Sequence, residues 1–261
     1  MRRSARRTRW SAVLILLAAL AAPHPASASD PVIAGDAAYA EGHGAEARTA
    51  WLAALESRPN DLAVLTRLVR VESELSEDAH GEEQRTLVMA AVDHARAAVK
   101  TAPDSAQAHV WLAVALGRQA LHEGPKTKLA LSREIKSEVD RSIALDPHIG
   151  RAYHVRAIWN RELSSLNMLE RAMANTVLGG VPKGASMDNA VADLRTAIEL
   201  EPDYVNHRLE LGRTYLQLKK FDLARPELEK AVALPPTSDL RDPKYQAEAR
   251  QLLDKFPKKK D

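Results

Sequence analysis

The sequence contains no cysteine among its 261 residues. This absence excludes disulfides, thiolate metal ligands, a cysteine nucleophile and the lipid-modified cysteine of a bacterial lipoprotein. Aromatic residues make up only 4% of the chain, too few for the usual core of a β-sandwich. No segment alternates polar and apolar residues with the period of two that strands require. Together, these absences indicate an all-α chain that must bury a real core without covalent links.

The chain also lacks the motifs of common enzymes. It has no H-E-x-x-H, no G-x-S-x-G, and no two histidines four residues apart among its nine. His148 and His154 are close along the chain, but the histidines as a group are scattered rather than convergent. We therefore expect no catalytic residue, no metal and no cofactor. An enzyme whose site residues are dispersed beyond recognition stays open as an alternative.

One glycine-rich segment has the spacing of a phosphate-binding loop, with Gly179 and Gly184 five residues apart. Such a loop needs a strand before it and a lysine directly after the second glycine. Here residues 160–178 have a helical pattern, and Ala185 stands where the lysine should be. We interpret the segment as a turn in which the glycines end one long helix and Ser186 caps the next.

Residues 1–28 have the pattern of a secretory signal peptide. They contain five arginines and no acid, an apolar run at 12–22, and the small-residue triplet 26–28. The run is shorter than the roughly 20 residues that span a bilayer, so we expect cleavage near Ala28 and a periplasmic or secreted protein. A short uncleaved anchor is the alternative interpretation.

Removing this segment changes the charge balance of the chain. Lys+Arg falls from 37 to 32 because five arginines are lost, whereas Asp+Glu stays at 35. The basic excess therefore belongs to the export signal and does not form a binding face, so we expect no nucleic-acid partner.

Five similar segments, each an alanine-rich amphipathic helix, run into a proline. Proline tends to follow helix ends because it cannot continue the hydrogen-bond pattern of a helix. The five prolines are separated by 44, 44, 55 and 34 residues, and they are Pro59, Pro103, Pro147, Pro202 and Pro236. The last interval equals the period of the tetratricopeptide repeat.

The unit before Pro236 carries small and large residues at the packing positions of that repeat. The small residues Gly212 and Ala224 allow two helices to approach closely, and Tyr215, Phe221 and Leu228 fill the remaining space. We predict an all-α, right-handed solenoid of antiparallel helix pairs. About five units would occupy residues 29–240, a capping helix residues 241–256, and a basic tail residues 257–261.

Several segments in the C-terminal part resemble the regulator of microtubule dynamics family, in its bacterial exported branch. They are LDP at 145–147, Trp159, LGGVPKGAS at 178–186, LEP at 200–202, NHRLELGRTYL at 206–216 and YQAEARQLL at 245–253. The resemblance covers roughly the last 145 residues, and it implies a helical-repeat domain that acts by binding rather than catalysis. The family name implies microtubules and membranes in eukaryotic relatives. We do not carry that activity over, because an exported chain would not meet microtubules.

The first helix of each pair should line the concave face of such a solenoid. Taking Gly212 as the reference position, the same register places an arginine on that face in several units. The predicted partner-binding residues are Arg70, Arg118, Arg161, Arg213, Asn206 and Gln217. Arginine presents fixed donor pairs to a carboxylate or phosphate, so an acidic peptide or a lipid headgroup would fit this face. Alternatively, these arginines form salt bridges with glutamates of the chain itself.

The sequence therefore predicts an interaction scaffold that binds a protein or peptide on its concave face. A carrier for a lipid or another amphiphile is an alternative, with Leu209, Ile158 and Leu216 as the apolar floor of the groove.

Overall fold

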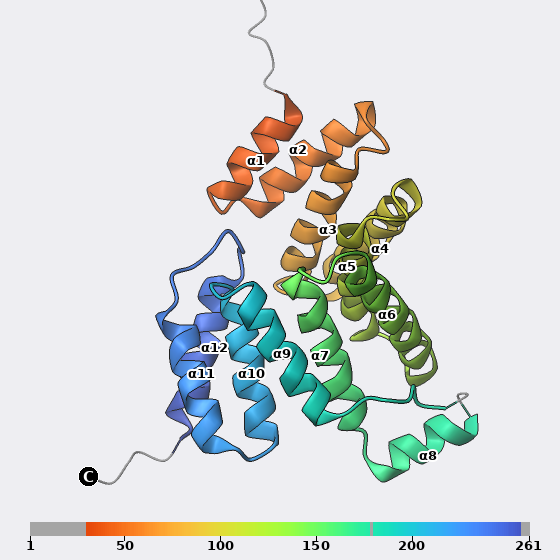
Figure 1. Cartoon of the computed structure of the whole chain (residues 1–261). Helices are drawn as coiled ribbons and strands as arrows, with labels where there is room; N and C mark the ends of the chain where they lie inside the picture. Colours follow the sequence, from red (N-terminus) through yellow and green to blue (C-terminus); the bar gives the residue numbers. More distant parts are fainter. Residues whose placement is uncertain (1–29, 178–179, 257–261) are drawn as a thin grey trace, which may run out of the picture.

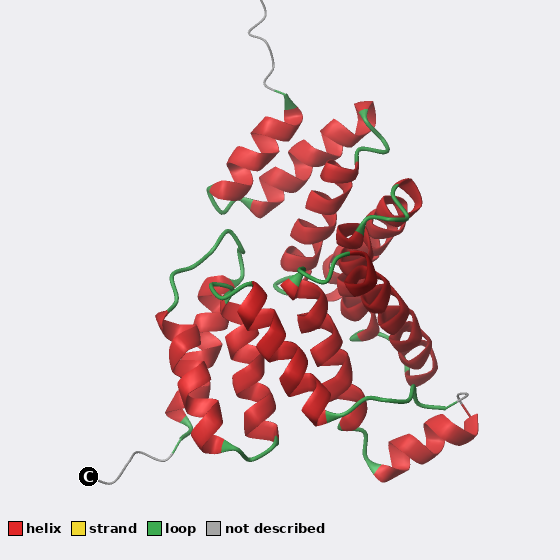
Figure 2. Ribbon diagram, viewed as in Figure 1, coloured by secondary structure: helices red, strands yellow, loops and turns green. Residues whose placement is uncertain are grey.

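The computed structural model describes residues 30–177 and 180–256. The expected signal peptide and the basic tail at 257–261 lie outside these residues. The described part of the chain contains twelve helices. Figure 2 shows helices joined by loops, and no strand in that part of the chain. The prediction of an all-α fold is confirmed.

Ten of the helices form five sequential pairs. The pairs are α1 (Pro31–Ala40) with α2 (Gly44–Ser57), α3 (Leu62–Ser76) with α4 (Gly81–Thr101), α5 (Ala106–Ala120) with α6 (Pro125–Leu145), α7 (Gly150–Ser164) with α9 (Met187–Leu200), and α10 (Val205–Gln217) with α11 (Phe221–Ala233). The two others are α8 (Met168–Val177), which comes between α7 and α9 in the chain, and α12 (Asp242–Asp254), which follows the fifth pair.

The second helix of each pair ends two or three residues before one of the five marked prolines. Polar side chains then start several of the following helices. Asp61 accepts hydrogen bonds from the amides of Ala63 and Val64, and Ser105 accepts one from Ala108. Each such bond satisfies an amide that the first turn of a helix leaves unpaired. The proline pattern therefore marks the unit boundaries of the solenoid.

The fourth unit differs from the prediction in one respect. The sequence pattern predicts one long helix up to the glycines at 179–180, but α7 ends at Ser164 and α8 begins separately at Met168. Asn167 and Glu170 explain the break, because each side chain accepts a hydrogen bond from the other's backbone amide at 2.9 Å. This reciprocal capping stabilises a new helix start. After the glycines, Ser186 caps α9 as predicted, by accepting from the amide of Asn189.

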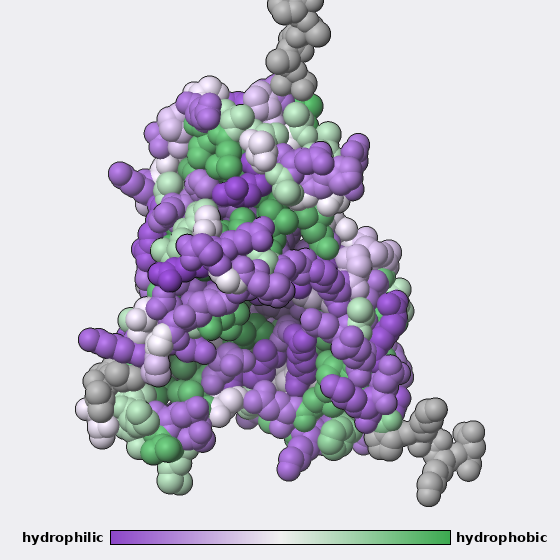
Figure 3. Space-filling view, turned by 180° about the vertical axis from the view of Figure 1, so that it is seen from behind, coloured by the Kyte–Doolittle hydropathy of each residue, from purple (hydrophilic) through white to green (hydrophobic). Residues whose placement is uncertain are grey.

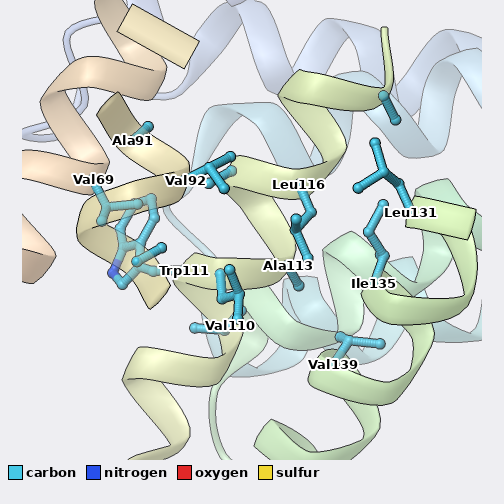
Figure 4. Packing of buried hydrophobic residues seen from close by; sticks show 14 of the residues in the cluster. Val69, Ala91, Val92, Val110, Trp111, Ala113, Leu116, Leu131, Ile135 and Val139 are labelled. Carbon is cyan, nitrogen blue, oxygen red and sulfur yellow. The ribbon is translucent and has the colours of Figure 1, made fainter. Parts of the chain in front are cut away.

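The largest hydrophobic cluster lies among α3 to α7, and Figure 4 shows its side chains pointing toward one another. Alanine and glycine set the distance between helices within the pairs. A Cβ atom added at Gly212 of α10 would lie 2.6 Å from the Cδ2 atom of Leu228 in α11. The small residue is therefore required for this close approach, as the repeat pattern predicts.

The C-terminal part of the chain returns to the second unit. Arg70 of α3 donates to the carbonyl of Ser238 at 2.8 Å, and Arg241 pairs with Glu77 at 2.9 Å and with Asp78. Leu240 packs against the hydrophobic cluster of the first three helices. Figure 1 shows the loop before α12 extending toward α1 and α2. We call these contacts of residues 238–241 with α3 and its C-terminal end the latch. The latch joins the end of the chain to the second unit, so that the second to fifth units form a closed ring.

Figure 3 shows a largely hydrophilic face that is hollowed near its centre, where hydrophobic surface is visible. None of the described helices combines the length and apolarity that a membrane crossing requires.

Candidate functional site in the concave cavity

The first helices of four pairs, α3, α5, α7 and α10, line a cavity of about 700 Å³ on the inside of the ring. Residues of α6, α8 and α12 complete its wall, together with Asp239 of the latch loop. The helices that we predicted to line the concave face therefore do so from the second unit to the fifth.

The cavity has an apolar side and a polar side. The apolar side comes mainly from α5, α6, α7 and the chain just after α7, and it includes Val114, Leu129, Ile135, Val155, Ile158, Trp159, Leu163 and Leu166. The polar side comes from α3, α7, α10 and the latch. Such a division suits a ligand that has both an apolar part and a charged group.

Five of the six predicted binding residues line this cavity, and Gln217 does not. The five are Arg70, Arg118, Arg161, Arg213 and Asn206. The side-chain amide of Gln217 instead donates to the hydroxyl of Ser165 at 2.6 Å. Gln217 therefore joins the ends of α7 and α10 outside the cavity.

All four predicted arginines pair with a carboxylate of this chain. Arg70 bonds to Glu74 at 2.9 Å, and Arg118 bonds to Glu77. These contacts match the alternative in which the arginines form internal salt bridges.

Arg161 and Arg213 share one carboxylate. Each donates to an oxygen of Glu210 at 2.5 Å, and Arg213 also bonds to Glu248. Only 6% of Glu210 is exposed. Burial raises the pKa of the Glu210 carboxyl, but the two arginines lower it by more, so this residue is ionised. A buried carboxylate that needs both cations makes these arginines structural as well as cavity-lining.

The apolar floor differs from the one that the sequence predicts. Ile158 lines the cavity, but Leu209 is fully buried in the core of α10, α11 and α12, and Leu216 packs against the same cluster. Both leucines face the paired helix rather than the concave side. The apolar lining comes instead from α5, α6 and α7.

Arg151 is a cavity residue that the sequence analysis missed. Its guanidinium carbon lies 4.5 Å from the ring centre of Trp111 and 5.1 Å from that of Tyr204. Within residues 30–177 and 180–256, no hydrogen bond or ion pair joins its guanidinium to another side chain. Burial lowers the pKa of Arg151, but the nearby Tyr204 and Asp239 raise it by more, so the guanidinium stays charged.

The register used in the sequence analysis contained a signal for Arg151. Asn206 precedes Gly212 by six residues, and Arg151 precedes Ala157, the small residue of the fourth unit, by the same number. Arg151 therefore occupies in α7 the position that Asn206 occupies in α10. Both side chains line the cavity.

Beside Arg151, two histidines and a glutamate form a hydrogen-bonded chain. The Nδ1 atoms of His154 and His207 are 2.9 Å apart, and Nε2 of His207 lies 3.1 Å from Glu201. Burial lowers the pKa of both histidines, and the charge of Arg151 lowers it further. The Glu201 carboxylate opposes this shift at His207 without reversing it, so both histidines are neutral at pH 7. His154 contacts His207 on another unit rather than His148.

The cavity also contains a buried hydroxyl without a partner. Ser73 is 3% exposed, lines the cavity, and its Oγ atom makes no hydrogen bond within the described residues. Such a group costs free energy unless something bonds to it. The unpaired polar groups of Ser73 and Arg151 show where a ligand could bind.

Stacked antiparallel helix pairs around a concave site define the tetratricopeptide-type class of helical-repeat proteins. Among solved structures, a thermophilic tetratricopeptide-repeat protein of Thermus thermophilus superposes with a TM-score of 0.60 at 22% sequence identity. The match covers 85% of this chain and 97% of that one.

Within this class, the chain belongs to the family described as Regulator of microtubule dynamics protein 1-3, whose profile matches residues 34–257. The match extends well beyond the last 145 residues in which we saw the resemblance. Regulator of microtubule dynamics protein 1 of Bos taurus is 31% identical over 202 residues, and that of Caenorhabditis elegans is 30% identical over 192. These alignments cover 76% and 74% of this chain, and 63% and 84% of the bovine and nematode proteins respectively.

Proposed function

We propose that this protein is a non-catalytic interaction protein that captures an acidic, partly apolar segment of a protein partner in its concave cavity. The tetratricopeptide-type fold supports an interaction role in general. One observation carries the proposed site: Arg151 is a charged group in the cavity that forms no hydrogen bond or ion pair with another described side chain. The four predicted arginines are already paired, so Arg151 replaces them as the main contact for an acidic group of the partner.

The cavity wall around Arg151 suits such a partner. The guanidinium carbon lies over the rings of Trp111 and Tyr204, and its N–H groups bond to no described side chain, so they are available to a carboxylate. Val155 and Ile158 follow on the same side of α7, and both line the apolar part of the cavity. A partner could therefore place its acid on Arg151 and an apolar side chain next to it.

Export from the cytoplasm belongs to the same proposal. The arginine-rich segment with its short apolar run at 1–28 supports it. Fractionation of the cells that make the protein, followed by N-terminal sequencing, tests export. The expected result is a chain that begins near Ser29 outside the cytoplasm; a full-length cytoplasmic chain would contradict it.

The binding proposal is tested by photocrosslinking in the cells that make the protein. A photoreactive amino acid at Val155, which lines the cavity, should capture a polypeptide that mass spectrometry identifies. Arg151→Gln should reduce capture at least tenfold, because it removes the charge but keeps a polar side chain of similar reach. Arg141→Gln is the matched control, because Arg141 lies in an exposed pair with Asp104 and does not line the cavity. Equal capture by Arg151→Gln and wild type would refute the proposal.

A carrier for an amphiphile is the second candidate, and the apolar side chains that α5, α6 and α7 contribute to the cavity favour it. Gentle purification followed by native mass spectrometry separates the two candidates. A bound small amphiphile that Arg151→Gln releases would support the carrier. Crosslinks to polypeptide alone would support the interaction protein.

A further inference from the structure

On the polar side of the cavity, helix α7 carries a hydrogen-bond donor, Arg151, close to a potential acceptor, His154. Arg151 and His154 lie three residues apart on α7, so their side chains are neighbours. Tyr204 lies next to both. Its ring centre is 6.5 Å from that of His154 and 5.1 Å from the guanidinium carbon of Arg151. Arg151 can only donate hydrogen bonds, whereas a neutral histidine can also accept one.

The hydrogen-bonded chain behind His154 fixes which of its nitrogens accepts. The Glu201 carboxylate accepts the hydrogen bond from Nε2 of His207, so that nitrogen carries the proton. Nδ1 of the neutral His207 is then unprotonated, and it accepts the bond from Nδ1 of His154 at 2.9 Å. Because His154 is neutral, its own Nε2 must carry a lone pair and no proton.

This lone pair has no partner among residues 30–177 and 180–256. His154 lines the cavity, and no described residue bonds to its Nε2 atom. Glu201 is held in place in turn, since it also accepts from the backbone amide of Arg151 at 3.1 Å. The cavity therefore presents a fixed acceptor beside a fixed cation.

We propose that this side of the cavity recognises a carboxylate with an N–H donor on the adjacent atom, the arrangement found at the C-terminal residue of a peptide. The proposal rests on the proposed function and specifies which acidic group the partner offers. Arg151 binds the carboxylate and His154 accepts the N–H of the last peptide bond. The hydroxyl of Ser73 provides one more polar contact within the same cavity.

Paired small probes test this chemistry on the purified full chain. N-octanoylglycine carries a carboxylate next to an amide N–H, and O-octanoylglycolate replaces that N–H with an ester oxygen. Binding of each is measured by calorimetry and by the fluorescence of Trp111 and Trp159, which both line the cavity. The wild type should bind the amide at least tenfold more tightly, because the ester leaves the lone pair of His154 without a donor.

Two variants assign the effect to the two residues. His154→Phe should bind both probes within a factor of about two of each other, because the acceptor is gone. Arg151→Gln should weaken both probes by similar factors and keep the preference for the amide. Arg141→Gln should behave as wild type. The comparison of probes in the wild type needs no variant, so it stands even if a variant fails to fold.

The outcomes separate the two proposals. If the wild type binds both probes equally well and Arg151→Gln weakens both, the role of His154 is refuted while the binding role of Arg151 stands. If the wild type binds neither probe, both proposals for this cavity fail. A preference for the amide that persists in His154→Phe would also overturn the assignment.

Discussion

At the scale of single residues, Glu74 lies where three parts of the chain meet. Its carboxyl accepts hydrogen bonds from Tyr39 of α1 and from Arg70 of α3, and Asp239 of the latch loop lies nearby. Burial, followed by the charge of Asp239, raises the pKa of Glu74 to about 7, although Arg70 and Tyr39 oppose the shift. The group therefore gains or loses its proton in the physiological range.

This shift predicts a pH-dependent stability. Because the folded pKa is above the ordinary value of 4.5, the folded state holds its proton where the unfolded state has lost it. The resulting stabilisation is present below pH 4.5 and disappears as the pH rises to about 7. Relative to Glu74→Gln, which cannot ionise, the wild type should lose on the order of 1–3 kcal/mol of unfolding free energy between pH 5 and pH 8.

Urea unfolding at the two pH values measures this difference. Glu56→Gln is the control, because Glu56 is an exposed residue of α2. A difference between wild type and Glu74→Gln that does not change with pH would contradict the assigned shift.

At the scale of helices, two helical glycines, one packed against a neighbouring helix and one facing the cavity, should respond oppositely to replacement by alanine. The Cβ of Gly212→Ala would lie 2.6 Å from the buried side chain of Leu228, so this side chain or the spacing of α10 and α11 must shift, at a typical cost of about 1–3 kcal/mol. Gly117 of α5 has nothing within 4 Å of an added Cβ. Gly117→Ala should therefore stabilise the protein by about 0.5–1 kcal/mol through helix propensity.

Thermal unfolding followed by circular dichroism compares the two variants under the same conditions. Each is the control for the other, since both changes add one methyl group within a helix. Destabilisation of similar size in both variants would show that the close packing at Gly212 does not determine how the protein responds to the added methyl group.

The sequence predicts the paired helices well because their causes are local. A proline ends a helix wherever it follows one, and the spacing between Gly212 and Ala224 already indicates a close helix contact. The break between α7 and α8 was missed although its cause is also local. Asn167 and Glu170 have the spacing of a reciprocal cap, but the helical pattern on both sides concealed it.

The candidate site was less predictable, because its residues depend on partners far away in the chain. Register alone placed five of six predicted residues on the cavity wall. It could not show that Arg161 bonds to Glu210, 49 residues further along, or that Arg151 has acids nearby but forms no ion pair with any of them among the described residues. Whether an arginine is available for a ligand depends on the three-dimensional contacts of the acids around it.

At the scale of the whole molecule, the latch should keep the ring closed. Arg241 is nearly buried and pairs with Glu77 and Asp78, so Arg241→Glu would place three acidic groups together. Breaking a buried pair such as Arg241–Glu77 typically costs about 3–5 kcal/mol, part of which opening of the ring would relieve. We expect Arg241→Glu to lengthen the distance between the second and fifth units.

Spin labels can measure this distance, since the chain has no cysteine of its own. Cysteines introduced at Glu83 in α4 and Asp222 in α11, both exposed, would carry the labels. Arg141→Glu, which reverses an exposed charge outside the latch, should leave the distance unchanged. An unchanged distribution in Arg241→Glu would show that the latch does not hold the units together.

Closure also limits how this architecture can change in length. An open array of repeats accepts one more helix pair at either end, because each unit contacts only its neighbours. Here Arg70 bonds to Ser238, which is 168 residues away in the chain, and Arg241 bonds to Asp78, which is 163 residues away. An extra pair would widen the circumference and separate them, so the number of units between α3 and α12 is fixed by the contact that joins the ends.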